Sequence, residues 1–448
     1  MTTAEVRLWG RTIGAVSWDE QRAIAFFEYE PEFQGSGIQV APLMMPLSAQ
    51  IYSFPELPHG TFHGLPGMLA DSLPDRFGNA LISTWLATQG RTEDSFDPVE
   101  RLCYTGSRAM GALEFEPARG PPGRQAKQIE IDALVELASE ILSRREGIEV
   151  SFDDEGRARA LMDILRVGTS AGGARAKAVI AWNPVTREVR SGQIEAGEGF
   201  THWILKFDGV SGNRDKELDD SRGYGLIEYA YHLMATDAGI TMTDCRILEE
   251  SGRHHFMTRR FDRGPRGEKT HMQSLCGMAH HDFNQPGAQA YEQALQVMAR
   301  LDLPMKGKEE QLRRMVFNVV ARNHDDHPKN IAFLMDRAGG WSLSPAFDVM
   351  YSFNPSGQWT GRHQMSVNGK RDKFEIADFV ACARTASLKR GRAEAIVEQV
   401  RDAVRKWPMF AAEAGVPADR AELIARTHRL EIDGSGRLSS HSDRAPHQ

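Results

Sequence analysis

Between Leu312 and Asp348 the sequence sets out an order of elements that limits the folds open to this chain. The apolar residues at the start recur at helical spacing, which predicts an amphipathic helix with one buried face. These residues are Leu312, Met315, Val316, Val319 and Val320. The polar sequence RNHDDHPKN follows, and Pro328 ends the helix. IAFLM and WSLSPAF then predict two strands joined by the turn DRAGG, and the second strand leads to Asp348.

This order suits phosphoryl transfer. The reaction needs a carboxylate that accepts the proton of the attacking hydroxyl, and oxygen ligands that hold Mg²⁺ against the phosphates of ATP. Asp325 and Asn330 have the Asp-x-x-x-x-Asn spacing of a protein-kinase catalytic loop, and Asp348 follows where a metal-binding aspartate is expected. We therefore predict Asp325 as the base, with Asn330 and Asp348 as metal ligands. Alternatively, this loop only caps a helix and satisfies its own polar groups in a turn.

A second chemistry is open to the same segment. His324 and His327 flank the aspartates, and another His-Asp pair, His281 and Asp282, lies upstream. Histidines beside aspartates can ligate a hydrolytic metal, so a metal-dependent phosphohydrolase is the alternative enzyme. Such sites usually lie on facing helices, whereas the catalytic-loop residues here flank predicted strands, and we rank the hydrolase second.

A kinase interpretation requires a nucleotide-binding lobe upstream. DILRVG and KAVIAW predict two strands around the turn TSAGGARA, in which Gly172 and Gly173 would let the backbone approach phosphates, with Lys177 near by. Lys206 ends the predicted strand THWILKF and is the expected phosphate contact. Glu228, on the helix that follows, is either its charge partner or a surface residue.

The segment FMTRRFDR, from Phe256 to Arg263, is expected to carry the hinge whose backbone groups contact the adenine edge. Phe261 would offer an apolar contact there. An ordinary place in the core is the alternative for this ring.

The length of 448 residues suggests two or three domains. VRLWGRTIGAVSW predicts a hairpin around Gly10-Arg11, AIAFFEYEPEF a strand, and GMLADSLPDRFGNALISTWLATQG helices. The sequence ARGPPGRQAK is rich in Pro, Gly and basic residues and is the best linker candidate. We predict an N-terminal domain (1–120), a nucleotide-binding lobe (128–265), a catalytic lobe (266–432) and a disordered tail (433–448).

Charge and apolar patterning exclude some classes of function. The chain has 54 Lys and Arg against 61 Asp and Glu, a net charge of −7, which argues against general nucleic-acid binding by the chain itself. No apolar run approaches the roughly 18 residues of a membrane span, and the start lacks the pattern of a signal peptide. The four cysteines form no CxxC pair. We expect a cytoplasmic protein that contacts no membrane.

Five motifs together resemble a known family. SAGGARAK, THWILK, TRRFDR, HDDHPKN and SPAFDVMYS occur in the order and at the approximate spacing of the HipA-like serine/threonine kinases, the toxin components of bacterial toxin–antitoxin pairs. GMLADSLPDRFGNALI is similar to part of their N-terminal domain, so the resemblance covers nearly the whole chain. It implies an α+β, protein-kinase-like fold with a mixed nucleotide lobe, a mostly helical C-terminal lobe and an N-terminal α+β subdomain. ATP and Mg²⁺ are the implied cofactors.

The resemblance implies roles for individual residues. Asp325 would be the catalytic base, and Asn330 and Asp348 would bind Mg²⁺. Ser170 matches a serine that such kinases phosphorylate on themselves; a phosphate there adds about −1.5 to −2 charges beside the phosphate-binding loop and should oppose ATP binding. The implied ATP contacts are Gly172, Gly173, Ala174, Arg175, Ala176, Lys177, Lys206, Arg259, Arg260, Phe261, His327, Pro328, Lys329, Asn330, Phe347 and Asp348.

The sequence also departs from the family pattern. Arg259 stands where the best-known relative has a glutamate, which leaves adenine contacts there to the backbone. Asp326 stands where that relative has glycine and places a second carboxylate beside the base, without an evident role. Arg175 and Ala176 replace other polar residues in the nucleotide loop.

Substrate and partners follow from the resemblance alone. Characterised relatives phosphorylate aminoacyl-tRNA synthetases, which blocks translation, and are neutralised by a small helix-turn-helix antitoxin that also binds operator DNA. A protein substrate of that kind, a HipB-like antitoxin and only indirect DNA contact are thus implied here. The alternative is a catalytically silent member that binds nucleotide and serves as a scaffold in a repressor complex.

Overall fold

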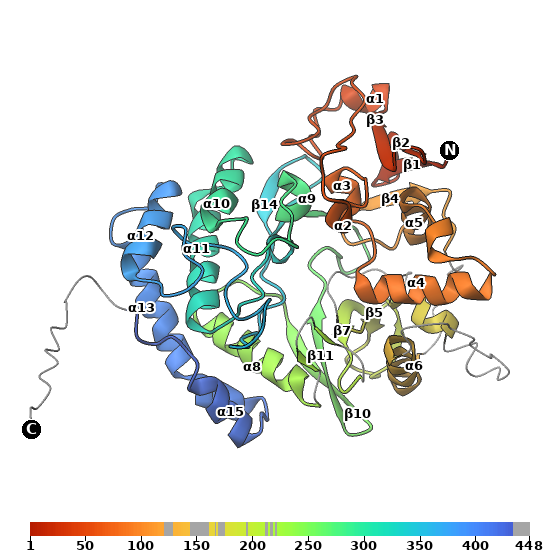
Figure 1. Ribbon diagram of the computed structural model, residues 1–448. Helices are drawn as coiled ribbons and strands as arrows, with labels where there is room; N and C mark the ends of the chain where they lie inside the picture. The colour runs from red at the N-terminus through yellow and green to blue at the C-terminus, as the bar shows by residue number, and fades with distance from the viewer. Residues whose placement is uncertain are drawn as a thin grey trace, which may run out of the picture.

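The computed structural model describes most of the chain (Figure 1). The described residues are 1–120, 129–143, 161–165, 167–168, 175–193, 196–210, 214–215, 218–219 and 222–432. Most of the predicted linker, the predicted tail, Ser170 and the loop residues Gly172–Ala174 lie outside them. Within the described residues, no helix is long and apolar enough to cross a membrane.

The N-terminal domain is built on a four-stranded antiparallel sheet in the order β3-β2-β1-β4. Its strands are β1 (Thr3–Leu8), β2 (Arg11–Asp19), β3 (Ile24–Tyr29) and β4 (Leu113–Glu116). The predicted hairpin is confirmed: β1 and β2 pair directly, and Gly10 has the positive φ of 80° that the tight turn requires. The short helices around the sheet are α1 (Pro31–Gln34), α2 (His59–Phe62), α3 (Gly67–Ala70), α4 (Arg76–Thr88), η1 (Glu93–Ser95) and α5 (Pro98–Thr105).

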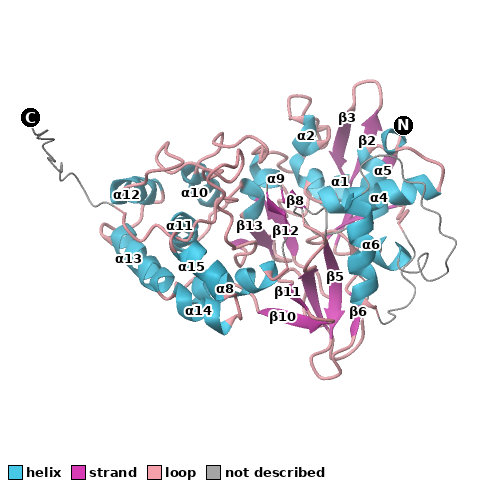
Figure 2. Ribbon diagram, turned by 60° about the horizontal axis from the view of Figure 1, so that its bottom comes forward, coloured by secondary structure: helices cyan, strands magenta, loops and turns pink. Residues whose placement is uncertain are grey.

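The nucleotide-binding lobe contains a five-stranded sheet in the order β10-β11-β7-β5-β6. Its strands are β5 (Lys177–Trp182), β6 (Val189–Ser191), β7 (Thr201–Lys206), β10 (Cys245–Glu250) and β11 (Arg253–Arg259), and a separate hairpin joins β8 (Arg214–Asp215) and β9 (Leu218–Asp219). Helices α6 (Ile131–Ser143) and α8 (Tyr224–Asp237) pack beside the sheet (Figures 1 and 2). The predicted strands KAVIAW and THWILK are confirmed as β5 and β7.

The strand predicted over DILRVG is wrong, because residues 161–165 are helical. Leu161, Ile164 and Leu165 are buried in the core of this lobe. Their i, i+3, i+4 spacing places them on one face of a helix, and a short apolar run does not by itself distinguish helix from strand.

The C-terminal lobe is mostly helical around the small sheet β12-β13-β14 (Figure 2). Its elements are β12 (His271–Ser274), α9 (Leu275–Ala279), α10 (Tyr291–Arg300), α11 (Met305–Val320), η2 (Pro328–Asn330), β13 (Ala332–Met335), β14 (Trp341–Leu343), α12 (Ile376–Thr385), α13 (Arg392–Arg405), α14 (Trp407–Glu413) and α15 (Ala418–Ala425). The predicted amphipathic residues of α11 are all buried in the main core of this lobe. The helix, loop and hairpin therefore follow in the predicted order.

The N-terminal domain shares its packing with both lobes. Phe77 and Leu81 of α4 belong to the same apolar core as the nucleotide-lobe sheet, while Cys276 and Met335 of the C-terminal lobe join the core of the N-terminal sheet. The three parts therefore support one another through continuous apolar contacts.

A buried charge cluster fixes the same junction. Asp262 accepts two hydrogen bonds from Arg260, at 2.9 and 2.7 Å, and one of 2.7 Å from the backbone N–H of Gly111. Arg263 donates to the same carboxylate at 2.7 Å. Burial disfavours the charged acid, but the two guanidinium groups outweigh it and hold the pKa of Asp262 well below its usual value.

We expect Asp262→Asn to lower the free energy of unfolding by about 3 kcal/mol, because it leaves buried arginines without a carboxylate. The pKa of Asp262 is lower in the folded protein, so its contribution is complete above the unfolded value of about 4 and is lost as the pH falls below it. Denaturant titrations from pH 7 to pH 3 measure both effects. Glu268→Gln, in the exposed pair with Arg266 at 3.0 Å, is the control and should leave the free energy of unfolding close to that of wild type. An equal loss in both variants would contradict the assignment.

Candidate active site

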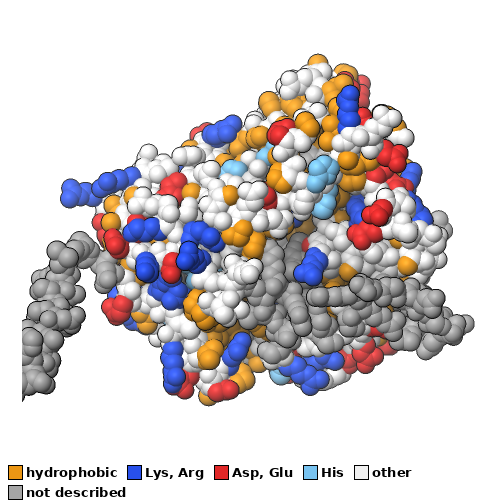
Figure 3. Space-filling model, in the orientation of Figure 1, with side chains coloured by type: hydrophobic (Ala, Val, Ile, Leu, Met, Phe, Trp, Pro, Cys, Tyr) orange, Lys and Arg blue, Asp and Glu red, His pale blue; other side chains and the backbone are white. Residues whose placement is uncertain are grey.

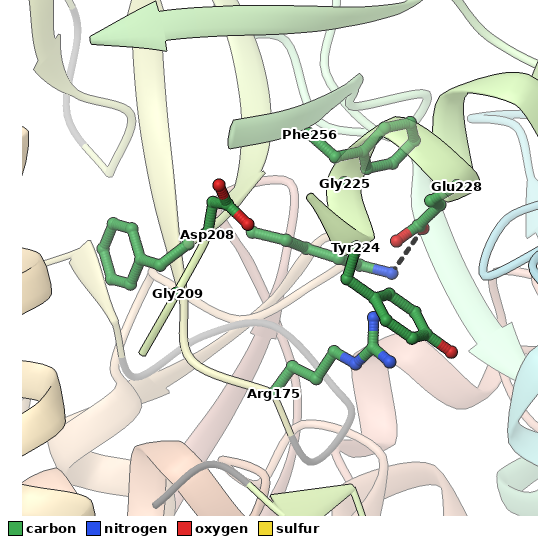
Figure 4. A pocket seen from close by; sticks show the side chains of 9 residues that line it. Arg175, Asp208, Gly209, Tyr224, Gly225, Glu228 and Phe256 are labelled. Atoms are coloured by element: carbon green, nitrogen blue, oxygen red, sulfur yellow. Dashed lines mark hydrogen bonds and ion pairs between the residues drawn. The ribbon is translucent and has the colours of Figure 1, made fainter. Parts of the chain in front are cut away.

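Lys206 is the centre of the site. It ends β7, and its Nζ atom lies 2.6 Å from Oε1 of Glu228 on α8 and also contacts Oδ1 of Asp348. The ion pair between Lys206 and Glu228 is drawn in Figure 4. The structure thus brings together the predicted lysine, its predicted charge partner and the predicted metal aspartate. Glu228 is 2% exposed, which answers the open question of whether it is a surface residue.

Burial and charge oppose each other at these three groups, and for Glu228 burial prevails and raises the pKa above its usual value. Burial favours neutral Lys206, but Asp348 and Glu228 outweigh it and raise the lysine pKa above its usual value. Burial also favours a neutral Asp348, and here the ammonium of Lys206 and then that of Lys177 lower the pKa to about 2. Asp348 is therefore a carboxylate at neutral pH, the form that can ligate a cation.

The catalytic loop lies against Asp348. Asn330 and Asp348, the predicted metal ligands, line the same small cavity together with Asp326 and Phe347. The side-chain amide of Asn330 donates a hydrogen bond of 2.9 Å to the backbone carbonyl of Asp325, which fixes the spacing between them. The side chain of Asp325 is 23% exposed, so it is partly accessible to solvent.

One later segment, residues 359–364, contacts three successive residues of the loop. The indole N–H of Trp359 donates to Oδ1 of Asp325 at 2.6 Å. The backbone carbonyl of Thr360 lies 2.9 Å from Nδ1 of His324. The backbone N–H of Gln364 donates to Oδ1 of Asp326 at 2.7 Å. Sequence patterns did not indicate this segment, because its contacts are made by backbone atoms and isolated side chains.

Asp326 is the structural anchor of the loop. It is 3% exposed, and its Oδ2 atom accepts a bond of 2.8 Å from the hydroxyl of Tyr291 and lies 2.9 Å from Nδ1 of His363. Burial raises the pKa of Asp326 to about 8, against the effect of these donors. The second carboxylate, which the sequence left without a role, holds the loop against α10 and residues 363–364.

The hinge residues have mixed surroundings. The Phe261 ring lies 5.7 Å from that of Phe347, so two predicted ATP contacts pack against each other beside Asp348. The side chain of Arg260 is enclosed with Asp262, and its backbone N–H donates to the carbonyl of His202 at 2.9 Å. Its guanidinium is therefore paired within the protein, and the contact of Arg260 with the nucleotide stays a prediction. Arg259 lies 3.7 Å from Asp244 at the surface.

The described end of the predicted phosphate loop, Arg175, lines a pocket together with Lys206 and Glu228. The guanidinium of Arg175 stacks on the ring of Tyr224 at 3.7 Å, within the pocket that Lys206 and Glu228 line (Figure 4). Lys177 is buried and lies 2.9 Å from Asp75 of the N-terminal domain. Ala176 is buried beside it, and its carbonyl accepts a bond from Phe207. Asp75 is a residue that sequence patterns did not select.

The histidines of the rival hydrolase do not converge. His324 is fully buried against His363 and has a pKa far below its usual value because of burial. Asp282, next to His281, contacts Thr61 of the N-terminal domain instead. Across the described part of the chain, no group of three or more His, Cys, Asp or Glu side chains could hold a metal ion.

Two predicted ATP contacts of the loop have close neighbours. Nε2 of His327 lies 3.8 Å from Oδ1 of Asp325, and Nζ of Lys329 lies 4.8 Å from the centre of the Phe283 ring.

The two lobes, with a lysine, a glutamate and an aspartate meeting between them, define a protein-kinase-like fold. Residues 169–407 match the model of the HipA-like C-terminal domain, and residues 4–116 match that of the HipA N-terminal domain. The first match alone covers more than half of the chain, which therefore belongs to the HipA-like family. No curated protein matches the chain.

Two solved structures are similar to it. One is a chain of the Shewanella oneidensis MR-1 toxin–antitoxin system HipA, HipB and its operator DNA complex, with a TM-score of 0.66, 18% identity and 94% of each chain covered. The other is the Helicobacter pylori proinflammatory kinase CtkA, with a TM-score of only 0.28, 10% identity, and 48% of this chain and 90% of that chain covered. The first supports the fold over nearly the whole chain, whereas the second is too distant to add to it.

We expect Asp326→Ala to lower the free energy of unfolding by about 2–3 kcal/mol, because it strands buried donors of Tyr291, His363 and Gln364. Asp325→Asn, one residue away and partly exposed, keeps its hydrogen bond from Trp359 and should leave stability within about 0.5 kcal/mol of wild type. Urea titrations of both variants measure the difference. If Asp326→Ala is as stable as wild type, this residue does not anchor the loop.

Proposed function

We propose that this protein is an ATP- and Mg²⁺-dependent serine/threonine protein kinase and the toxin of a toxin–antitoxin pair. The observation that carries the proposal is Lys206 held between Glu228 and Asp348, with Asn330 and Asp348 lining one cavity. The arrangement supports the proposal because a fixed ammonium and two oxygen-bearing side chains are the groups that the phosphates of ATP and their cation would need.

The donor set suits magnesium. Asp348 is ionised, as its pKa of about 2 requires, and Asn330 supplies an amide oxygen in the same cavity; hard oxygen ligands of this kind are those that Mg²⁺ prefers. When bound, the ion would neutralise charge that develops on the phosphoryl group. Lys206 would orient the phosphates, and Arg175 would add a second positive charge from the loop side.

Asp325 would accept the proton of the attacking hydroxyl. Its exposure to the cleft admits a substrate side chain, and the bond from Trp359 to Oδ1 limits its rotation and leaves Oδ2 for the hydroxyl. Asn330 fixes the backbone of Asp325 by the bond to its carbonyl. This direct contact within the loop thus holds the proposed base, Asp325, and the proposed metal ligand Asn330 in fixed positions relative to each other.

The family resemblance suggests the targets. We propose that the chain phosphorylates its own Ser170 and, as its substrate, an aminoacyl-tRNA synthetase, which would block translation. The competing proposal is a catalytically silent member that binds nucleotide only. The intact set of Asp325, Asn330, Asp348 and Lys206 favours the active kinase.

Incubation with Mg²⁺ and ATP should add one phosphate to the wild-type chain at Ser170, as measured by intact mass and peptide mapping. Asp325→Ala should gain less than about 1% as much, since loss of a catalytic carboxylate costs about 10²–10⁴ in rate. Omission of Mg²⁺ or the change Asp348→Asn should also remove the gain.

Asp336→Asn is the matched control, because among the described residues this aspartate side chain accepts its bonds from the turn between β13 and β14, namely from Ala338 and Gly340. It should be phosphorylated as wild type. A wild-type chain that binds ATP but gains no mass would favour the silent scaffold, and one that binds no ATP would refute both. Phosphoproteomics of cells expressing wild type or Asp325→Ala would then name the substrate.

We further propose a small helix-turn-helix antitoxin as the partner, with DNA contacted through it. The similar Shewanella chain comes from a complex with HipB and operator DNA. On the face shown in Figure 3, Lys and Arg side chains are interspersed with acidic ones, in keeping with the net charge of −7. Because operators and translation are cytoplasmic, this function places the chain in the cytoplasm.

Gel-shift titrations with operator DNA from the chain's own locus test the partner. The chain alone should give no specific shift at physiological salt, and addition of a helix-turn-helix protein encoded beside it should give a complex that contains both proteins. A specific shift by the chain alone would contradict indirect DNA contact.

A further inference from the structure

Two lysines lie side by side on the sheet that faces the cleft. Strands β5 and β7 are antiparallel, and Lys177 is the direct register partner of Lys206. Directly opposed residues project to the same face of a sheet, with Cβ atoms roughly 5 Å apart, and like charges in such a pair repel. The side chain of Lys177 is 3% exposed and that of Lys206 is 12% exposed, so each charge is stabilised by a carboxylate close by.

The two lysines obtain their carboxylates from different parts of the chain. Lys206 has Glu228 and Asp348, as described above. Lys177 lies 2.9 Å from Oδ2 of Asp75, and the two side chains are only 3% and 4% exposed. Asp75 belongs to the N-terminal domain, where it is the N-cap of α4: its Oδ1 atom accepts a bond of 2.7 Å from the N–H of Gly78. One carboxylate therefore caps a helix with one oxygen and neutralises Lys177 with the other.

This pair adjoins the active site through the register of the two strands. Burial raises the pKa of Asp75, and the ammonium of Lys177 opposes this rise. Asp75 of the N-terminal domain and Lys177 of the nucleotide lobe thus lie next to Lys206 and its two carboxylates.

We infer that Asp75 is a positioning residue for the nucleotide site: the N-terminal domain holds Lys177 beside Lys206, so that two adjacent ammonium groups face the phosphates. The N-terminal domain is then part of the nucleotide-binding machinery rather than only an accessory to it. This inference rests on the proposed function, because it assumes that a nucleoside triphosphate binds at Lys206.

Titration calorimetry with Mg²⁺ and a non-hydrolysable ATP analogue tests the inference on the full-length chain. Asp75→Asn keeps an oxygen for the helix cap but removes the charge, and we expect affinity to fall about tenfold, the loss of one charge-assisted contact. Lys177→Met should cause a similar loss. In the double variant the losses should not add, because Asp75 acts through Lys177.

The double variant also guards against misfolding, since it leaves no buried charge unpaired. It should fold and bind the analogue about tenfold more weakly than wild type. The inference would be overturned if the double variant or Asp75→Asn bound the analogue with wild-type affinity. It would also be overturned if the losses of affinity in the two single variants added in the double variant.

Glu114→Gln is the matched control. Glu114 pairs with Lys269 at 2.7 Å and, like Asp75, joins the N-terminal domain to the rest of the chain, but its side chain forms no hydrogen bond or ion pair with a site residue in the part of the chain that the structure describes. The Glu114→Gln variant should bind the ATP analogue with wild-type affinity. A tenfold loss in this variant as well would mean that domain docking in general, and not Asp75, supports binding. That result would also overturn the inference. If wild type itself binds no analogue, the proposed function fails rather than the role of Asp75.

Discussion

The buried ammonium of Lys206 is the interaction on which the site depends. A charge that is removed from water is stable only beside opposite charges, and Lys206 meets this condition by contact with Glu228 from a helix and Asp348 from the other lobe. The same contact sets the distance between the nucleotide lobe and the catalytic loop, because the lysine must reach both carboxylates. The orientation of the two lobes therefore has to be the one in which both carboxylates can neutralise the charge of Lys206.

The surroundings of the catalytic loop supply the rigidity that this arrangement needs. Asp326 is tied to Tyr291, His363 and Gln364, while the neighbouring Asp325 has a partly exposed side chain oriented by Trp359. Two adjacent aspartates thus have opposite roles because of burial: the buried one holds the backbone, and the accessible one is available for proton transfer. The N-terminal domain adds a second support through the apolar cores that it shares with both lobes.

Much of this could be predicted where local sequence patterns decide the outcome. The hairpin at Gly10, strands β5 and β7 and helix α11 follow from turn residues, short apolar runs and helical spacing, whereas motif order leaves Glu228 open between a charge partner of Lys206 and a surface residue. The strand predicted over DILRVG was wrong because a short apolar run fits two periodicities. The pairing of the Arg260 side chain could not be predicted, because its partner, Asp262, also accepts hydrogen bonds from Arg263 and Gly111, and such shared contacts leave no periodic signal.

The amino-acid sequence by itself determined the order of elements, the spacing of Asp325, Asn330 and Asp348, and the family to which they point, since all of these are local patterns. Only the tertiary structure decided which charge compensates which. Lys206 and Glu228 are 22 residues apart, within one stretch of strand and helix, whereas Lys206 and Asp348 are 142 residues apart. The pairing of Lys177 with Asp75, and the anchoring of Asp326, arise when separate elements pack and bury charged groups that must then find partners, a condition that no spacing along the chain records.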